Sequence, residues 1–176
     1  MFAPLALLNP SAGPEREGFR MKLVYERLYI GTEEDCRHGD NEWAVVHACK
    51  SPCHQREVGY HGSLPNTHPN YLVLEKENDL ILNMIDPPRP LFMPKLFADF
   101  LVFSEKHWTK EEKLLIHCNL GESRAPSLAL LFMAKYSHKI SNIDYENAKS
   151  EFINLFPGYA PGLGIQIYLR QHWDEF

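Results

Sequence analysis

A cysteine and an arginine six positions apart are the residues of this sequence best suited to chemistry. Cys118 and Arg124 lie in the segment HCNLGESRAPS, residues 117–127. The apolar run LLIH leads straight into the cysteine, a glycine stands in mid-loop, and a proline closely follows the arginine. This order predicts a buried strand, a tight loop and a helix with proline in its first turn. The alternative is that Cys118 is a small, inert core residue.

A loop between a strand and a helix N-terminus is suited to bind an anion. Its backbone N–H groups turn inward, and the helix dipole adds positive charge at the same place. Gly121 can adopt the positive φ that such a loop requires, and the planar guanidinium of Arg124 matches two phosphate oxygens. The same field favours the thiolate form of Cys118, which is the form that attacks phosphorus. The predicted phosphate-binding residues are Asn119, Leu120, Gly121, Glu122, Ser123 and Arg124.

This loop resembles a family signature. The pattern His-Cys-x-x-Gly-x-Ser-Arg is similar to that of the cysteine-based protein tyrosine phosphatases, and in particular of their compact dual-specificity branch. Segments 27–31 and 161–169 resemble the first strand and the C-terminal helix entry of that branch, so the likeness covers most of residues 21–176. The resemblance implies an α/β fold with a central mixed, mostly parallel sheet flanked by helices. It also implies phosphate monoester hydrolysis through a phosphocysteine intermediate, with no metal and no other cofactor.

Attack by the thiolate requires an acid that protonates the leaving group, and Asp86 is our candidate. A carboxylic acid on a nearby loop can donate this proton and later activate water. The resemblance implies an aspartate after a strand upstream of the nucleophile, and Asp86 stands between the apolar run at 80–85 and two prolines. We interpret its rivals, Asp79 and Asp99, as a turn residue and a solvated helix charge. The alternative for Asp86 is a turn residue that precedes proline.

Ala125 departs from the family pattern, which usually has serine or threonine directly after the arginine. In the family this hydroxyl donates a hydrogen bond to the cysteine sulfur and stabilises it as a leaving group. Its absence predicts that phosphocysteine breakdown is slowed by roughly ten- to a hundred-fold, unless Ser123 or Ser127 replaces it. A second hypothesis follows from this departure, namely a phosphate-binding pseudophosphatase or a slow substrate trap.

Charge narrows the class of substrate. Lipid-directed relatives carry lysines in the loop, whereas Glu122 is acidic, which argues against inositides and 5′-triphosphate RNA ends; a solvated rim charge is the alternative interpretation. The formal net charge of −5 and the absence of a basic stripe also argue against RNA. We therefore expect a phosphoprotein or phosphopeptide substrate, no nucleic-acid or membrane partner, and a monomer. An RNA-end or small-metabolite phosphatase is the less favoured alternative.

The segment HACKSPCH, residues 47–54, contains four potential metal ligands. They are His47, Cys49, Cys53 and His54. No second Cys/His pair with zinc-finger spacing follows them, so we expect no metal here. The alternatives are a plain surface loop or a loop that shapes substrate access, with His54 or Arg56 near the phosphate.

Apolar patterning predicts the elements that position these residues. Strands are expected at 22–30, 43–48 and 114–117, and a hairpin at 71–74 and 80–84. Helices are expected at 94–107 and 124–138, from a cap at Ser141 or Asn142 to Leu155, and at 162–173. Residues 33–36 suggest a helical turn and residues 50–70 a long surface loop. Interleaved strands and helices indicate an α/β domain whose helices cover the sheet.

Length and composition bound the remaining possibilities. The 176 residues fit one domain, and we expect it at 21–176, after a disordered extension at 1–20. The apolar start of the chain has no basic region and contains proline, which is not typical of a secretory signal. Four unevenly spaced cysteines do not suit a disulfide scaffold and favour a reduced, cytoplasmic setting.

Overall fold

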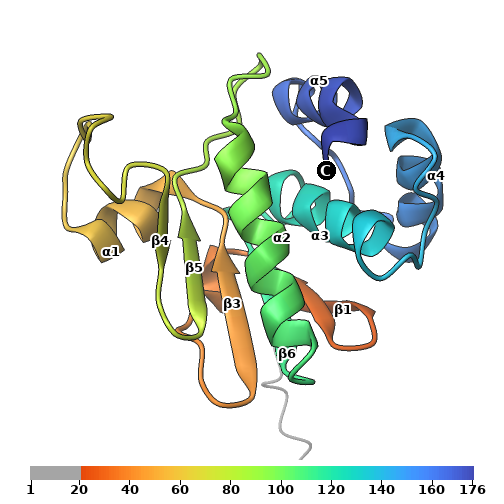
Figure 1. The fold of residues 1–176 in the computed structure, drawn as a ribbon, viewed down its shortest axis with the longest axis horizontal. Helices are drawn as coiled ribbons and strands as arrows, with labels where there is room; N and C mark the ends of the chain where they lie inside the picture. The colour runs from red at the N-terminus through yellow and green to blue at the C-terminus, as the bar shows by residue number, and fades with distance from the viewer. Residues whose placement is uncertain (1–20) are drawn as a thin grey trace, which may run out of the picture.

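A six-stranded sheet forms the centre of the protein in this computed structural model, which describes residues 21–176 (Figure 1). The expected disordered extension at 1–20 lies outside the described residues. The strand order is β1-β2-β6-β3-β5-β4. The four inner strands are parallel to one another and the two edge strands are antiparallel, which confirms the predicted mixed, mostly parallel sheet. The strands are β1 (Lys22–Tyr25), β2 (Leu28–Gly31), β3 (Trp43–His47), β4 (Val73–Glu75), β5 (Asp79–Leu82) and β6 (Lys113–His117).

The long helices form the layer that covers one face of this sheet. Both α2 (Pro94–Trp108) and α3 (Arg124–Lys135) contact β6 and each other, so they lie side by side on that face (Figure 1). Outside them, α4 (Tyr145–Leu155) packs on α3, and α5 (Leu163–His172) packs on α4. Short helical segments complete the fold: η1 (Glu33–Asp35), η2 (Lys50–His54), α1 (Gln55–Val58) and η3 (Trp173–Glu175). Within residues 21–176, none of the helices combines the length and apolarity that a membrane span requires.

The two faces of the sheet have different coverings because side chains alternate along each strand. Ala44 and Val46 of β3 belong to the large core that α2 and α3 complete. Val45 and His47 therefore point to the opposite face, where both are fully buried. Short segments between the strands cover this second face, and Arg37, for example, stacks on the Trp43 ring. Polar residues on that face are thus shielded from water by loops and short helical turns rather than by the long helices.

The expected single strand at 22–30 is wrong. The chain forms a hairpin instead, in which Tyr25 pairs with Leu28 across a tight turn. Glu26 occupies the left-handed region of the turn, with φ of 45°. Glycine, asparagine and aspartate usually mark such a turn, so a glutamate gave no signal in the sequence.

Two further expectations need correction. Residues 50–70 are not only a surface loop, because they include η2 and α1 and bury the side chains of Cys53 and His54. Neither Ser141 nor Asn142 caps α4; the Asp144 carboxylate does so, accepting a hydrogen bond from the Asn147 N–H at 2.8 Å. The β4–β5 hairpin and the remaining strands and helices lie where the patterning predicts them, with ends that differ by a few residues.

Candidate active site

Strand β6 brings Cys118 to the start of the loop that follows it. Because β6 lies between β2 and β3, neighbours on both sides hold its end. The Ala48 N–H donates to the His117 carbonyl at 2.8 Å, and the Cys118 N–H donates to the Gly31 carbonyl at 3.4 Å. The cysteine itself is only 1% exposed. Its thiol therefore lies buried at the end of a strand that is paired on both sides.

The loop after Cys118 has the backbone of an anion cradle. Gly121 has a φ of 72°, as the sequence predicts, and a Cβ there would lie 3.1 Å from the Gly31 carbonyl oxygen. In the described part of the chain, no backbone N–H of residues 119–124 donates a hydrogen bond to another protein group. Helix α3 begins at Arg124, so its N-terminal end faces the same loop. These N–H groups are available to bind an anion.

Hydrogen bonds from both terminal nitrogens, Nη1 and Nη2, hold the guanidinium of Arg124. Its Nη1 donates to the backbone carbonyls of Ala48 and Met84, both at 3.1 Å. Its Nη2 donates to the Asn119 side-chain oxygen at 2.7 Å. Its Nε is buried and has no hydrogen-bond partner among the described residues. The protein thus orients the planar group and leaves a donor for a ligand.

The side chain of Asn119 supports Arg124 rather than lining the cradle. While its oxygen accepts from Arg124, its Nδ2 donates to the Glu33 carboxylate at 2.8 Å and to the Ser51 carbonyl at 2.9 Å. The segments after β2 and β3 are therefore both tied to the loop through this one amide. Sequence reasoning missed this role, because no local pattern links positions 33, 51 and 119.

Asp86 lines the same cavity as Cys118 and Arg124. This cavity has a volume of about 170 Å³. Asp86 reaches it from the loop after β5 and lies against the start of α5, where a Cβ on Gly162 would come within 2.2 Å of its Oδ1. The structure thus brings Asp86 to the loop that carries Cys118 and Arg124, although 32 positions separate it from the cysteine. The lining is completed by Leu120, Glu122, Ser123, Ala160 and Gly162.

The two rival carboxylates lie elsewhere. Asp79 is buried at the start of β5, where it accepts from the His47 Nε2 and the Gly39 N–H, each at 2.9 Å. Burial alone would raise the pKa of Asp79, but these hydrogen bonds outweigh it and lower the pKa overall. Asp99 pairs with Lys95 on the surface of α2 at 2.5 Å. Neither lines the cavity, and Asp79 is more than the turn residue that the sequence suggested.

The hydroxyl groups of Ser123 and Ser127 are engaged away from the cysteine. The Ser123 Oγ accepts from the Gly162 N–H at 2.8 Å. The Ser127 Oγ lies 2.9 Å from the Tyr159 hydroxyl, which lies 3.1 Å from the Tyr145 hydroxyl. Burial raises the pKa of Tyr145 to about 12 and that of Tyr159 well above its usual value, so both phenols stay neutral. These contacts anchor α3 and α5, and in the described part of the chain neither serine hydroxyl bonds to the Cys118 sulfur.

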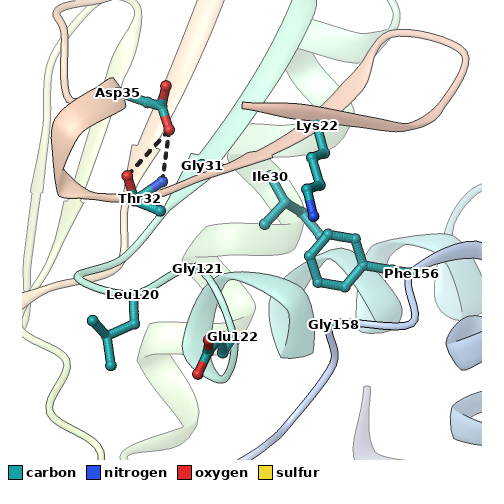
Figure 2. A pocket seen from close by; sticks show the side chains of 10 residues that line it. All are labelled: Lys22, Ile30, Gly31, Thr32, Asp35, Leu120, Gly121, Glu122, Phe156 and Gly158. Atoms are coloured by element: carbon teal, nitrogen blue, oxygen red, sulfur yellow. Dashed lines mark hydrogen bonds between the residues drawn. The ribbon is translucent and has the colours of Figure 1, made fainter. Parts of the chain in front are cut away.

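A second cavity of about 200 Å³ also borders the loop after Cys118 (Figure 2). Leu120, Gly121 and Glu122 line it, and Ile30 and Phe156 add apolar surface. Leu120 and Glu122 line both cavities, and the Leu120 side chain is 70% exposed. Among the described residues lining the Cys118 cavity, Arg124 is the only cation. That cavity therefore suits one phosphate group with an apolar substituent beside it.

Neither His54 nor Arg56 lines the Cys118 cavity. His54 is buried and bonds to the Tyr60 hydroxyl at 3.0 Å and to the Asn70 carbonyl at 2.9 Å. Arg56 bonds to the Glu57 carboxylate at 2.9 Å. The segment after β3 contacts the loop through the Ser51 carbonyl instead.

Solved structures with the same architecture are phosphatases or phosphatase-like proteins. No family model matches this sequence, and no curated protein is similar enough to it to count as a match. The human tyrosine phosphatase-like serine/threonine/tyrosine-interacting protein has a TM-score of 0.61 and 15% identity, over 88% of this chain and 96% of its own. A mouse putative dual specificity phosphatase, complexed with zinc tungstate, has a TM-score of 0.60 and 14% identity, over 97% and 94%.

A third structure, the PTP-2 phosphatase of Cydia pomonella, has a TM-score of 0.59 and 17% identity, over 88% of this chain and 90% of its own. At such identities the similarity concerns the fold. All three cover nearly the whole length of both chains. The protein therefore has the fold of the dual-specificity and protein tyrosine phosphatases.

Proposed function

We propose that this protein is a dual-specificity-type phosphatase that hydrolyses phosphotyrosine in phosphoproteins, with phosphoserine and phosphothreonine as further substrates. The observation that carries the proposal is that Asp86, from the loop after β5, lines one cavity of about 170 Å³ together with Cys118 and Arg124 of the loop after β6. The exposed Leu120 side chain at this cavity supports an aromatic substituent next to the phosphate. The catalytic unit in this proposal is residues 21–176.

In the proposed reaction, the Cys118 thiolate attacks phosphorus and forms the S–P bond. The bond from phosphorus to the leaving oxygen breaks, and Asp86 donates its proton to that oxygen. Arg124 and the N–H groups of residues 119–124 stabilise the phosphoryl oxygens during the transfer. The Asp86 carboxylate then takes a proton from water, which attacks phosphorus. The S–P bond breaks, and inorganic phosphate and the thiolate are released.

Covalent trapping tests this mechanism most directly. The wild-type protein is mixed with a phosphotyrosine peptide, quenched in acid, and analysed by peptide mass spectrometry. We expect one added phosphoryl group on the peptide that contains Cys118, and no label when orthovanadate is present. Parallel assays with phosphotyrosine and phosphothreonine peptides rank the substrate classes. Phosphate release without any label on Cys118 would contradict the proposal.

Replacement of Asp86 by asparagine is expected to lower turnover of phenyl and alkyl phosphates by about a hundredfold, because the leaving oxygen loses its proton donor. Esters with very good leaving groups need no such proton, so their cleavage should change much less. The measurement is kcat for a series of aryl phosphates. The control is Asp99→Asn, which removes an exposed carboxylate from α2. Equal losses across the series would contradict the assignment.

Replacement of Ala125 by serine is expected to raise steady-state kcat by up to about tenfold, because a hydroxyl near the sulfur stabilises it as a leaving group. Neither neighbouring serine hydroxyl bonds to the Cys118 sulfur among the described residues, so the native loop lacks this hydrogen bond. Stopped-flow assays should show a burst of product and slow turnover in the wild type, and a smaller burst in the variant. Ala129→Ser, another buried alanine on α3, is the control.

Ala125 also favours a second candidate function, a phosphate-binding pseudophosphatase or substrate trap. This candidate would be supported if the wild-type protein accumulates a stable phosphocysteine without turnover and the Ala125→Ser variant hydrolyses it. An RNA-end or small-metabolite phosphatase is a third, less favoured candidate. The proposal otherwise includes a monomer in a reducing, cytoplasmic setting, which the four free cysteines support, and no nucleic-acid or membrane partner.

A further inference from the structure

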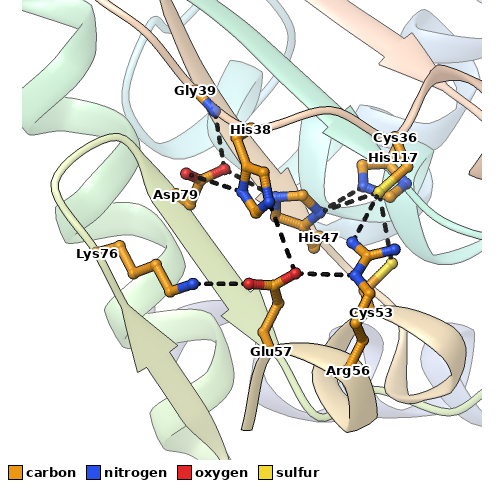
Figure 3. A network of polar contacts seen from close by, with 10 residues as sticks. All are labelled: Cys36, His38, Gly39, His47, Cys53, Arg56, Glu57, Lys76, Asp79 and His117. Carbon is orange, nitrogen blue, oxygen red and sulfur yellow. Dashed lines mark hydrogen bonds and ion pairs between the residues drawn. The ribbon is translucent and has the colours of Figure 1, made fainter. Parts of the chain in front are cut away.

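Four sulfur and nitrogen side chains converge on the second face of the sheet, the face that α2 and α3 do not cover (Figure 3). Their potential ligand atoms all lie within 4.8 Å of one another. They come from four segments: the loop after η1, the end of β3, the η2 turn and the end of β6. We propose that these residues, Cys36, His47, Cys53 and His117, bind a structural zinc ion. The proposal does not depend on the proposed phosphatase reaction.

The sheet register places the two histidines together. His47 and His117 are the last residues of β3 and β6, and they are direct partners in the parallel ladder. Direct partners in neighbouring strands point to the same face, so the rings lie side by side. The His117 Nε2 is 2.8 Å from the His47 Nδ1, and both rings are fully buried. The strand ends thus supply two imidazoles on a rigid frame.

The two thiols complete a set with tetrahedral spacing. The Cys36 Sγ is 3.9 Å from the Cys53 Sγ and 3.6 Å from the His47 Nδ1. Tetrahedral zinc with ordinary Zn–S and Zn–N bonds has S–S edges of about 3.8 Å and S–N edges of about 3.6 Å. Its N–N edge is about 3.3 Å, so the two rings would need to separate by roughly half an ångström. The sulfur positions already match a bound ion.

Neighbouring polar groups orient the ligands. The Asp79 carboxylate accepts from the His47 Nε2 at 2.9 Å, which directs the lone pair of the His47 Nδ1 towards the cluster. A carboxylate behind a ligating histidine is a recurrent feature of zinc sites. The Arg56 Nη2 donates to the Cys36 Sγ at 3.5 Å, as suits a thiolate. The Gly39 N–H in turn holds Asp79 at 2.9 Å (Figure 3).

Charge and ligand type favour zinc. Two thiolates neutralise the charge of a divalent ion, and two neutral imidazoles add none, so the complex has no net charge. A neutral complex suits a site in which three of the four residues are buried. Two sulfur and two nitrogen ligands in a tetrahedron are typical of zinc. Binding would release the two thiol protons. Four protein ligands leave no open position, which indicates a structural role.

This proposal departs from the expectation that residues 47–54 bind no metal. Of the four potential ligands in that segment, only His47 and Cys53 belong to the cluster. The other two ligands come from residues 36 and 117. The competing interpretation is a metal-free cluster in which Cys36 and Cys53 form a disulfide on oxidation.

Metal analysis of the purified full chain tests the proposal. The protein is prepared with a reductant and without chelators, and its metals are measured by inductively coupled plasma mass spectrometry. We expect about one zinc per chain. After chelation and addition of cobalt, the wild type should show the visible bands of tetrahedral Co²⁺ and a thiolate-to-cobalt charge-transfer band. Chelation should also lower the melting temperature.

Variants separate the cluster from its surroundings. Cys36→Ser and Cys53→Ser should lose zinc and the charge-transfer band, whereas Cys49→Ser, a nearby buried cysteine outside the set, should keep both. Asp79→Asn keeps all four ligands and should weaken zinc binding by about ten- to a hundredfold. If the cysteine variants do not fold, the wild-type cobalt spectrum still decides. Metal-free protein with an octahedral cobalt spectrum, or a reductant-resistant disulfide between Cys36 and Cys53, would overturn the proposal.

Discussion

Replacement of Cys118 by serine is expected to reduce turnover of a phosphotyrosine peptide by roughly 10⁴- to 10⁶-fold, as loss of a catalytic nucleophile generally does. A serine hydroxyl at this position stays protonated at neutral pH, so no anion is available to attack phosphorus. The replacement changes one buried atom and leaves the loop backbone and Arg124 in place. Steady-state release of inorganic phosphate measures the effect.

Phosphate binding should survive this change. We expect phosphate to be bound by the N–H groups of residues 119–124 and by the guanidinium of Arg124, and the substitution removes none of these. Cys118→Ser should therefore still bind a phosphotyrosine peptide in isothermal titration calorimetry. Cys49→Ser is the matched control, because Cys49 is also a buried free thiol but does not line the cavity. Activity of Cys118→Ser within tenfold of the wild type would show that another group is the nucleophile.

The conformation of the loop at residues 118–124 could be predicted from the sequence because its determinants are contiguous. The strand, Gly121 and the helix start follow one another within a few residues, and local backbone preferences fix such a turn. The structure confirms the positive φ of Gly121 and the start of α3 at Arg124. The place of Asp86 after a strand and before prolines predicts a side chain near the loop, and it does reach the cavity. Its role as general acid remains a prediction.

Features that depend on strand register could not be predicted. His47 and His117 become neighbours only because β3 and β6 pair in parallel with those residues opposite each other. A shift of one residue would place the two rings on different faces. Their separation of 70 residues leaves no local signal. The same holds for Asn119, whose contacts with Glu33 and Ser51 appear only when the sheet has formed.

The proposed zinc site and the loop at residues 118–124 are held by the same neighbouring segments. His117 directly precedes Cys118 in the chain. Cys36 lies three residues after Glu33, and Cys53 lies two residues after Ser51. The Asn119 side chain donates hydrogen bonds to both Glu33 and Ser51. Asn119 in turn orients Arg124. An ion that fixes Cys36 and Cys53 would therefore stabilise the groups that hold the arginine, without touching the substrate.

Replacement of Arg124 by lysine is expected to lower kcat/KM for a phosphotyrosine peptide by about a thousandfold, within the range found for arginines that stabilise phosphoryl transfer. Lysine keeps the charge but loses the planar fork that matches two phosphoryl oxygens. It also cannot reproduce the three hydrogen bonds to Ala48, Met84 and Asn119 that orient the guanidinium. The affinity for orthovanadate, which mimics the transition state, should fall with kcat/KM.

The comparison between the two variants separates binding from attack. Cys118→Ser should bind a phosphopeptide and fail to turn it over. Arg124→Lys should lose binding and turnover together, because in the proposed mechanism the arginine contacts the phosphoryl group in both the bound complex and the transition state. Arg170→Lys, an exposed arginine on α5 paired with Glu146, controls for the substitution itself. Thermal unfolding verifies that the Arg124 variant is folded, since two of its hydrogen bonds tie the loop to neighbouring segments. Arg124→Lys with normal vanadate affinity would show that the phosphate is held by other groups, and the cavity would then lose its assigned clamp.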